Sequence, residues 1–354
     1  MVSCLMNGGI RALPADLCPS CGLVGAVLYP ALTDRLFGAP GLWNIRRCGS
    51  RACGAVWLDP QPIDDDVPKL YERYYTHESG DDVDPNLGSG SRRQARRAIL
   101  REVFGYTQHY PSEPLSLSAY VYSRSALQRD RAGRYVLWLK AVPDGRLLDF
   151  GCGSGNFMRR MSRLGWNVVG YEPDPKAAAT AQATLGLPVV SGDSADGACH
   201  GDPFDAIVLN HVVEHLPRPE ETLRDLAKAL KPRGQLVVVT PNFDSLGRVY
   251  FGSNWRGLEP PRHLRIYRSR SLRACAVAGG YEIDRIFSVA ASAPWMWLQG
   301  LALKGGGHDI ALKQQRMPTR LGWATARGFE AVEQIALTVG SFGEEIVVSG
   351  RRCS

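Results

Sequence analysis

The feature that most constrains this chain is the run LLDFGCGSGNF at positions 147–157. Residues 146–150 form a short apolar run typical of a buried strand, and the residues from Asn156 onward have helical spacing. Between them, Gly151, Gly153 and Gly155 supply the sharp turn that leads from a strand into a helix. Because glycine has no Cβ, such a loop approaches a ligand closely, and the free N–H groups at the helix start attract a carboxylate or phosphate. The sequence therefore predicts a nucleotide-like cofactor at this loop.

The spacing of the glycines distinguishes between cofactors. A dinucleotide-binding loop reads GxGxxG, whereas here Asp149 precedes three alternating glycines. Its carboxylate would repel a pyrophosphate but suits the ammonium group of S-adenosylmethionine, so an NAD-dependent oxidoreductase is disfavoured. At this point the chain resembles the class I, Rossmann-like S-adenosylmethionine-dependent methyltransferases, and the resemblance extends over about 125–290.

The resemblance implies an α/β fold with a seven-stranded sheet of order 3-2-1-4-5-7-6 and helices on both faces. Glu172 ends the second predicted strand, where an acid can accept both ribose hydroxyls. The resemblance places Asp193 beside the adenine amine and adds the backbone N–H of Ser194. Ligands gather at the carboxyl ends of parallel strands, so Asn210, after the fourth predicted strand, completes the cofactor set. The expected cofactor-binding residues are Asp149, Gly151, Gly153, Gly155, Glu172, Asp193, Ser194 and Asn210.

Two cysteine pairs precede this region. Cys18 and Cys21 form a CPxCG knuckle, and Cys48 and Cys53 follow as a second pair with wider spacing. Four thiolates so placed fit a tetrahedral, structural zinc ribbon over 15–60, and four ordinary reduced cysteines are the alternative. Residues 56–62 resemble the exit of the N-terminal zinc ribbons found in many bacterial small-molecule methyltransferases.

Length and composition set the organisation. With 354 residues, 44 % of them hydrophobic, the chain can bury a full core. We expect a linker with cover helices over 61–119 and a methyltransferase domain over 120–354, with a helical insertion at 290–340 before the last strand. Neither an uninterrupted apolar run long enough to span a membrane nor a secretory signal is evident, so a cytoplasmic location is expected.

Histidines at the predicted rim suggest acid–base chemistry. Methyl transfer is an in-line displacement, and an oxygen acceptor must also lose its proton. His211, His215 and His263 are the histidines placed for this work, and imidazole titrates in the useful range. The stretch 210–215 resembles the part of ubiquinone-biosynthesis O-methyltransferases that offers two glutamates and a histidine to a metal, with His211 replacing the first glutamate. A divalent ion on His211, Glu214 and His215 therefore stays open beside a metal-free alternative.

The acceptor is approached through the segment 255–264, which carries Arg256 and Arg262 beside His263. Guanidinium forks suit phosphate and carboxylate, so these two arginines predict an anionic small-molecule acceptor, such as a nucleotide sugar or a phosphorylated precursor. O-methylation is the first hypothesis, and C-methylation of a nucleotide-linked deoxysugar is the second. An RNA methyltransferase is disfavoured, because the chain has no catalytic tetrad such as NPPY after the fourth predicted strand. A catalytically silent scaffold is the remaining alternative.

Other features are less specific. Arginines at helical spacing over 92–101 predict either a solvated helix face or an anion clamp over the active site. Trp295 and Trp297 indicate burial against the core or a second subunit, or else contact with a membrane interface. The net charge of +7 is compatible with nucleic acid, an anionic membrane surface or a phosphorylated substrate, and by itself it does not distinguish among these partners. No nucleic-acid partner is expected, while peripheral membrane contact and a homodimer are compatible with the sequence.

Overall fold

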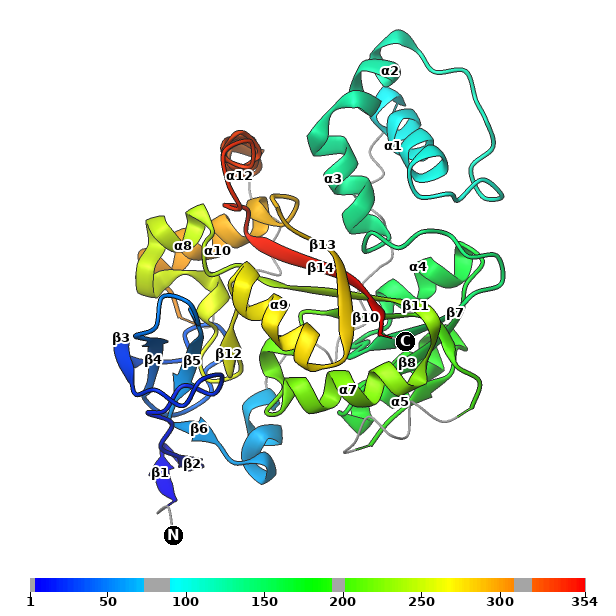
Figure 1. The fold of residues 1–354 in the computed structure, drawn as a ribbon. Helices are drawn as coiled ribbons and strands as arrows, with labels where there is room; N and C mark the ends of the chain where they lie inside the picture. The colour runs from blue at the N-terminus through cyan, green and yellow to red at the C-terminus, as the bar shows by residue number, and fades with distance from the viewer. Residues whose placement is uncertain (1–3, 73–89, 193–200, 309–319, 354) are drawn as a thin grey trace.

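A computed structural model describes residues 4–72, 90–192, 201–308 and 320–353 of the 354-residue chain. Its centre is a seven-stranded sheet in which all neighbours are parallel except β14, which runs antiparallel to both of its own neighbours. Numbered along the chain, the strand order is 3-2-1-4-5-7-6, as predicted (Figure 1). From one edge to the other the strands are β9 (Val189–Val190), β8 (Asn167–Tyr171), β7 (Arg146–Phe150), β10 (Phe204–Asn210), β11 (Leu230–Pro241), β14 (Glu345–Arg352) and β13 (Tyr281–Val289).

Helices cover both faces of this sheet because consecutive strand residues point to opposite sides. Leu148 and Ile207 lie in one core cluster, with residues of α7 and α9, whereas their neighbours Leu147 and Val208 lie in another, with Met158 of α4. The order βαβ repeats along the chain, which is the pattern that builds a parallel sheet with two helical layers. The core helices are α4 (Asn156–Arg163), α5 (Pro175–Leu185), α7 (Pro219–Ala229) and α9 (Ser269–Ala278).

The segment ahead of β7 is helical over most of 117–135. It forms two helices that meet at Ser125, and the second one ends at Tyr135. The backbone then turns sharply, because Leu137 and Trp138 both have positive φ. The cover consists of α1 (Gly90–Glu102), α2 (Leu117–Arg124) and α3 (Ala126–Tyr135), which pack against one another to one side of the sheet (Figure 1). Arg96 of α1 is buried, so this basic helix is not a fully solvated face.

The N-terminal part contains a four-stranded sheet of order β12-β5-β4-β3. Three of these strands are β3 (Gly25–Leu32), β4 (Trp43–Cys48) and β5 (Val56–Asp59), but the fourth is β12 (Arg265–Ile266), from the end of the predicted acceptor region. Strands β1 (Leu5–Asn7), β2 (Ile10–Leu13) and β6 (Gln61–Pro62) form a second small sheet. The predicted ribbon is therefore joined to the rest of the chain by backbone pairing, and the domain limits given above stay predictions.

Helices also occupy the region after β13. Trp297 stacks on Phe329 with ring centroids 4.0 Å apart and on Tyr250 at 5.4 Å, so this tryptophan is buried, whereas Trp295 is 43 % exposed. The helices here are α10 (Ala293–Lys304) and α12 (Arg320–Ala336), and α8 (Leu246–Phe251), which precedes β13 in the chain, packs against α10. The 3-10 helices among the described residues are η1 (Asp64–Tyr71), η3 (Val213–His215), η4 (Gly252–Asn254) and η5 (Arg256–Leu258). Among the described residues, no helix has the length and apolarity needed to cross a membrane.

Candidate functional site

The glycine loop adopts a backbone that only glycine accepts without strain. Gly151, Gly153 and Gly155 have φ of 80°, 53° and 75°, and Gly155 is the N-cap of α4. A Cβ on Gly151 would lie 2.4 Å from a methyl group of Val212, which belongs to the segment after β10. The predicted strand–loop–helix is confirmed, and the loop lies directly against the segment that carries the predicted histidines.

Two buried carboxyl groups lie near the carboxyl ends of neighbouring strands. Asp149 is the next-to-last residue of β7, and Glu172 directly follows β8. Burial and the nearby Glu172 raise the pKa of Asp149 to about 7. Glu172 accepts the N–H of Gly153 at 2.9 Å and that of Asp174 at 3.2 Å, which ties the second strand to the loop. A cationic ligand group would restore the ionised form of Asp149, as the ammonium or sulfonium of S-adenosylmethionine does.

Asn210 completes this edge at the end of β10. Its Oδ1 is buried and has no hydrogen-bond partner among the described residues. A buried polar atom without a partner is costly and points to a ligand that supplies one. We call Asp149, the loop 151–155, Glu172 and Asn210 the cofactor edge, and its residues fit S-adenosylmethionine. Asp193 and Ser194 lie outside the described residues.

Two of the predicted histidines converge beyond this edge. The ring centroids of His215 and His263 lie 4.8 Å apart, and one ligand atom each of Glu214, His215 and His263 falls within 4.8 Å of the others. His215 Nδ1 lies 3.0 Å from the carbonyl oxygen of Arg262, and His263 Nδ1 lies 2.8 Å from that of Gly257. A carbonyl oxygen only accepts, so both Nδ1 atoms carry hydrogen, and the Tyr71 hydroxyl, also 3.0 Å from His215 Nδ1, then accepts from the same N–H. Both Nε2 atoms therefore keep a lone pair. Such a set can bind a proton or hold a divalent ion.

The electrostatics of this cluster keep both rings neutral. Burial lowers the pKa of His263 to about 4 and also lowers that of His215. Burial would raise the pKa of Glu214, but the hydrogen bond and charge of His211 lower it to about 2. Neutral imidazoles beside an ionised carboxylate are ready to accept a proton, because the carboxylate stabilises the cation that forms.

His211 is arranged differently. Its Nε2 lies 2.6 Å from Glu345 and its Nδ1 lies 3.3 Å from Glu214. Burial alone would lower the pKa of His211, but the bonds to the two glutamates outweigh it and raise the pKa to about 9. At neutral pH the ring is therefore a cation with both nitrogens facing carboxylates. This geometry does not support the prediction of His211 as a base, nor its inclusion in a metal set with Glu214 and His215.

The predicted substrate arginines have protein partners. Arg262 is buried, and its guanidinium donates to Asp34 at 2.8 Å and to Glu259 at 2.9 Å. Arg256 is also buried and donates to Glu259 and Gln299. The arginine forks are thus directed at carboxylates and an amide of the chain itself. The prediction that they clamp an anionic substrate is corrected to a structural role within the segment 255–264, which we call the acceptor segment.

The four N-terminal cysteines meet at one point. Cys18 Sγ lies 3.6 Å from Cys53 Sγ, Cys21 Sγ lies 3.4 Å from Cys48 Sγ, and all four sulfurs fall within 4.8 Å of one another. Four sulfurs bound to one zinc at ~2.3 Å lie ~3.8 Å apart in a tetrahedron. The residues therefore fit a structural zinc ion, which stays a prediction.

Comparisons with known proteins agree with the geometry of the cofactor edge. Residues 123–286 match the family model described as a methyltransferase domain. Residues 123–286 are thus similar to a methyltransferase domain, in agreement with the resemblance to the class I S-adenosylmethionine-dependent methyltransferases. Ubiquinone biosynthesis O-methyltransferase of Caulobacter sp. (strain K31) is 41 % identical over 160 residues, which are 41 % of this chain and 62 % of that protein. The mitochondrial enzyme of the same name from Schizosaccharomyces pombe is 32 % identical over 111 residues, or 29 % of this chain and 40 % of its own length.

The chain thus spans about three fifths of the length of the first of these curated relatives, at 62 %. Among solved structures, an S-adenosylmethionine-dependent methyltransferase from Mesorhizobium loti is 17 % identical, with a TM-score of 0.42, and the match covers 63 % of this chain and 98 % of that one. A likeness this low carries no argument about the site.

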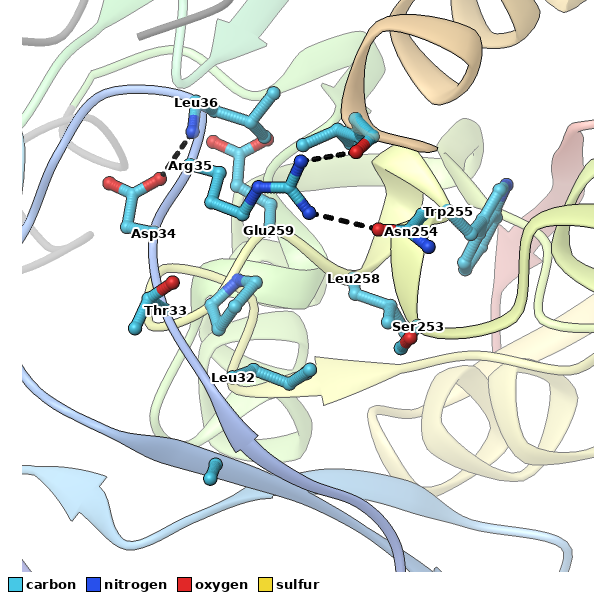
Figure 2. Close-up of a pocket in the computed structure, with 13 residues that line it drawn as sticks. Leu32, Thr33, Asp34, Arg35, Leu36, Ser253, Asn254, Trp255, Leu258 and Glu259 are labelled. Atoms are coloured by element: carbon cyan, nitrogen blue, oxygen red, sulfur yellow. Dashed lines mark hydrogen bonds between the residues drawn. The ribbon is translucent and has the colours of Figure 1, made fainter. Parts of the chain in front are cut away.

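Sequence reasoning misses the partners of the methyltransferase domain's charged residues. Asp34 lies 228 residues from Arg262, and Glu345 lies 134 residues from His211. Only Glu259 carries a local signal, because it precedes Arg262 by three residues. Beside these residues a cavity of about 210 Å³ opens between the N-terminal sheet and the acceptor segment (Figure 2). The Arg35 guanidinium donates a hydrogen bond to Asn254 Oδ1 at 2.9 Å beside this cavity, and Glu259 is one of the residues that line it.

Proposed function

We propose that the protein transfers the methyl group of S-adenosylmethionine to a hydroxyl oxygen of a small molecule. The observation that carries the proposal is the pair of neutral histidines that keep free Nε2 lone pairs beside Glu214, next to the glycine loop. The name shared by the curated relatives, ubiquinone biosynthesis O-methyltransferase, supports oxygen as the acceptor atom.

In this mechanism the bound cofactor supplies an electrophilic methyl group. The cofactor edge orients it through Asp149, Glu172 and Asn210, and the acceptor hydroxyl gives its proton to a histidine. We assign this step to His215, because it is partly exposed whereas His263 is only 3 % exposed. Glu214 stabilises the resulting imidazolium from within the same cluster.

The acceptor is a small molecule whose recognition does not need the guanidinium groups of Arg256 and Arg262, since both are buried against Glu259. This leaves the anionic acceptor without support from these two side chains. C-methylation of a nucleotide-linked deoxysugar would use the same base, so the product distinguishes it from O-methylation. The four-cysteine cluster is proposed to hold one structural zinc ion.

The test is to incubate the pure protein with methyl-labelled S-adenosylmethionine and a metabolite extract, and to identify the labelled product by NMR. A methoxy signal supports the proposal, a C-methyl signal replaces it with the second hypothesis, and no labelled product contradicts both. With the product known, His215→Ala should lower kcat about 10²- to 10⁴-fold, the usual contribution of a general base. The exposed His308 gives the matched control, and His308→Ala should keep the wild-type rate.

A further inference from the structure

Asp34 is a buried carboxylate in the turn between β3 and β4 of the N-terminal sheet. Its Oδ1 accepts the N–H groups of Leu36 and Phe37 at 3.0 and 3.1 Å, and its Oδ2 accepts that of Ala39 at 2.8 Å. These three bonds hold the carboxylate rigidly within its own turn. Asp34 is therefore a fixed point from which the N-terminal sheet can position another residue.

The residue that Asp34 holds is Arg262. The two side chains meet at 2.8 Å, and both are completely shielded from solvent. The same guanidinium donates to Glu259 at 2.9 Å and to the carbonyl oxygen of Leu70 at 3.2 Å. Figure 2 shows Asp34 on the N-terminal segment and Glu259 on the acceptor segment, both among the residues that line the cavity. Arg262 thus joins the two parts of the molecule through its side chain.

The backbone of Arg262 reaches the histidines. Its carbonyl oxygen accepts His215 Nδ1–H at 3.0 Å, and its neighbour His263 lies with Nε2 3.7 Å from Glu259. A hydrogen bond at one ring nitrogen sets which nitrogen carries the proton and how the ring is turned. Anchoring Arg262 therefore fixes one of the two contacts of His215 Nδ1, the other being the Tyr71 hydroxyl at 3.0 Å, and with it the tautomer and the orientation of the ring to which we assign proton transfer.

The connection is reinforced just beyond the histidine. Leu58 of β5 donates its N–H to the carbonyl oxygen of Leu264 at 3.0 Å, and β12 then pairs with β5. The chain on the far side of His263 is thus also attached to the N-terminal sheet. Arg262 and Leu264 are held on either side of His263 by the same structural unit.

We propose that Asp34 is a positioning residue for methyl transfer, acting through Arg262 on His215 and His263. The N-terminal sheet then forms part of the acceptor side of the enzyme and is not a separable appendage. The proposal rests on the proposed function for its effect on rate, but its effect on the histidine rings can be observed in the absence of any acceptor.

The test uses Asp34→Asn in the full chain. The amide keeps the size of the side chain but removes the charge that holds Arg262. We expect the ring nitrogens of His215 to lose the pure Nδ1–H signature in ¹⁵N spectra of histidine-labelled protein. With an identified acceptor, kcat should fall roughly ten- to a hundredfold, as for a misplaced reacting group, while the Kd for S-adenosylmethionine stays unchanged.

The matched control is Asp59→Asn. Asp59 is also a buried carboxylate of the N-terminal sheet and is also paired with an arginine, Arg46, at 2.6 Å, and it accepts the N–H of Ala15 at 2.8 Å. It makes no hydrogen bond or ion pair to the described part of the acceptor segment. Asp59→Asn should lower the melting temperature by a similar amount yet leave the histidine signals and kcat as in the wild type.

Two results with Asp34→Asn would overturn the proposal. One is an unchanged His215 tautomer in folded Asp34→Asn, and the other is an equal change in both variants, which would indicate general loosening of the sheet. If Asp34→Asn does not fold, Arg262→Lys tests the same connection, because a single ammonium cannot bridge Asp34 and Glu259 as the guanidinium does. An unchanged tautomer in Arg262→Lys would also overturn the proposal. Absence of methyl transfer in the wild type would contradict the proposed function alone.

Discussion

The cofactor edge and the acceptor segment lie on neighbouring parts of the same site but satisfy their polar groups in opposite ways. At the cofactor edge the Asp149 carboxyl is buried beside Glu172, and Asn210 Oδ1 has no partner among the described residues. In the acceptor segment the charges of Arg256, Glu259 and Arg262 neutralise one another and Asp34. The edge therefore offers polar groups for a ligand to complete, whereas the charges of the segment are balanced by side chains of the protein itself. Charge density alone does not mark a binding surface.

The largest effect should follow loss of the cysteine cluster. This loss should affect the acceptor segment but not the cofactor edge. Structural zinc sites contribute ~10 kcal/mol or more of binding free energy to the folds they hold. Protein purified without chelator should contain about one zinc per chain, and Cys48→Ser should lose it. Hydrogen exchange should then rise in β5 and in the acceptor segment, while calorimetry still detects S-adenosylmethionine binding.

The exposed Cys4 lies outside the cluster, so Cys4→Ser serves as the control and should keep both zinc and stability. A protein that keeps its melting temperature under strong chelation would show that the cluster has no structural role.

The next effect concerns Arg262, which has either a structural or a substrate-binding role. A structural role predicts a loss of stability on substitution, and a substrate-binding role predicts a raised acceptor KM. Arg262→Met removes one partner of a buried ion pair and leaves Asp34 without its arginine, while Glu259 keeps only Arg256 as its arginine partner. Such losses cost about 3–5 kcal/mol of unfolding free energy, which denaturant titration measures. Arg218, an exposed arginine, is the control, and Arg218→Met should change stability little. A stable Arg262→Met protein with a raised acceptor KM would restore the substrate-binding interpretation.

At the cofactor edge a substitution should weaken binding more than stability. Glu172→Ala removes the acceptor of the Gly153 N–H and the proposed partner of the ribose. We expect S-adenosylmethionine binding to weaken by about 1–3 kcal/mol in calorimetry, the cost of unpairing buried hydrogen-bond groups. The exposed Glu221 is the matched control. Equal affinity in Glu172→Ala and Glu221→Ala would place the ribose elsewhere.

The smallest effect is a pH dependence at the boundary of the two regions. His211 has its pKa raised to about 9 from an ordinary value of 6.5. Its contribution to stability is therefore fully present below pH 6.5 and is lost as the pH rises through 9. The difference between the stability curves of the wild type and His211→Asn should shrink over this window. A constant difference would show that His211 is not charged in the folded protein.

Local patterns predict the fold and the glycine loop well. The glycine run 151–155 demands positive φ, and continuous apolar runs such as 146–150 and 204–210 form strands that are buried on both faces of the sheet. The cysteine knuckles likewise predict the convergence of their sulfurs. The acceptor segment is different, because whether an arginine faces solvent, a substrate or a carboxylate depends on residues such as Asp34, hundreds of positions away. The same holds for His211, whose two glutamates convert an expected base into a cation.

The pairing of β12 with β5 also imposes an order on folding during synthesis. Strand β5 ends at Asp59, but its partner begins at Arg265, so about two hundred residues must follow it from the ribosome before the small sheet is complete. Throughout that interval the outer edge of β5 presents unpaired backbone groups beside Trp57 and Leu58. The nascent N-terminal unit is therefore most exposed to wrong pairing while the methyltransferase sheet is still being made.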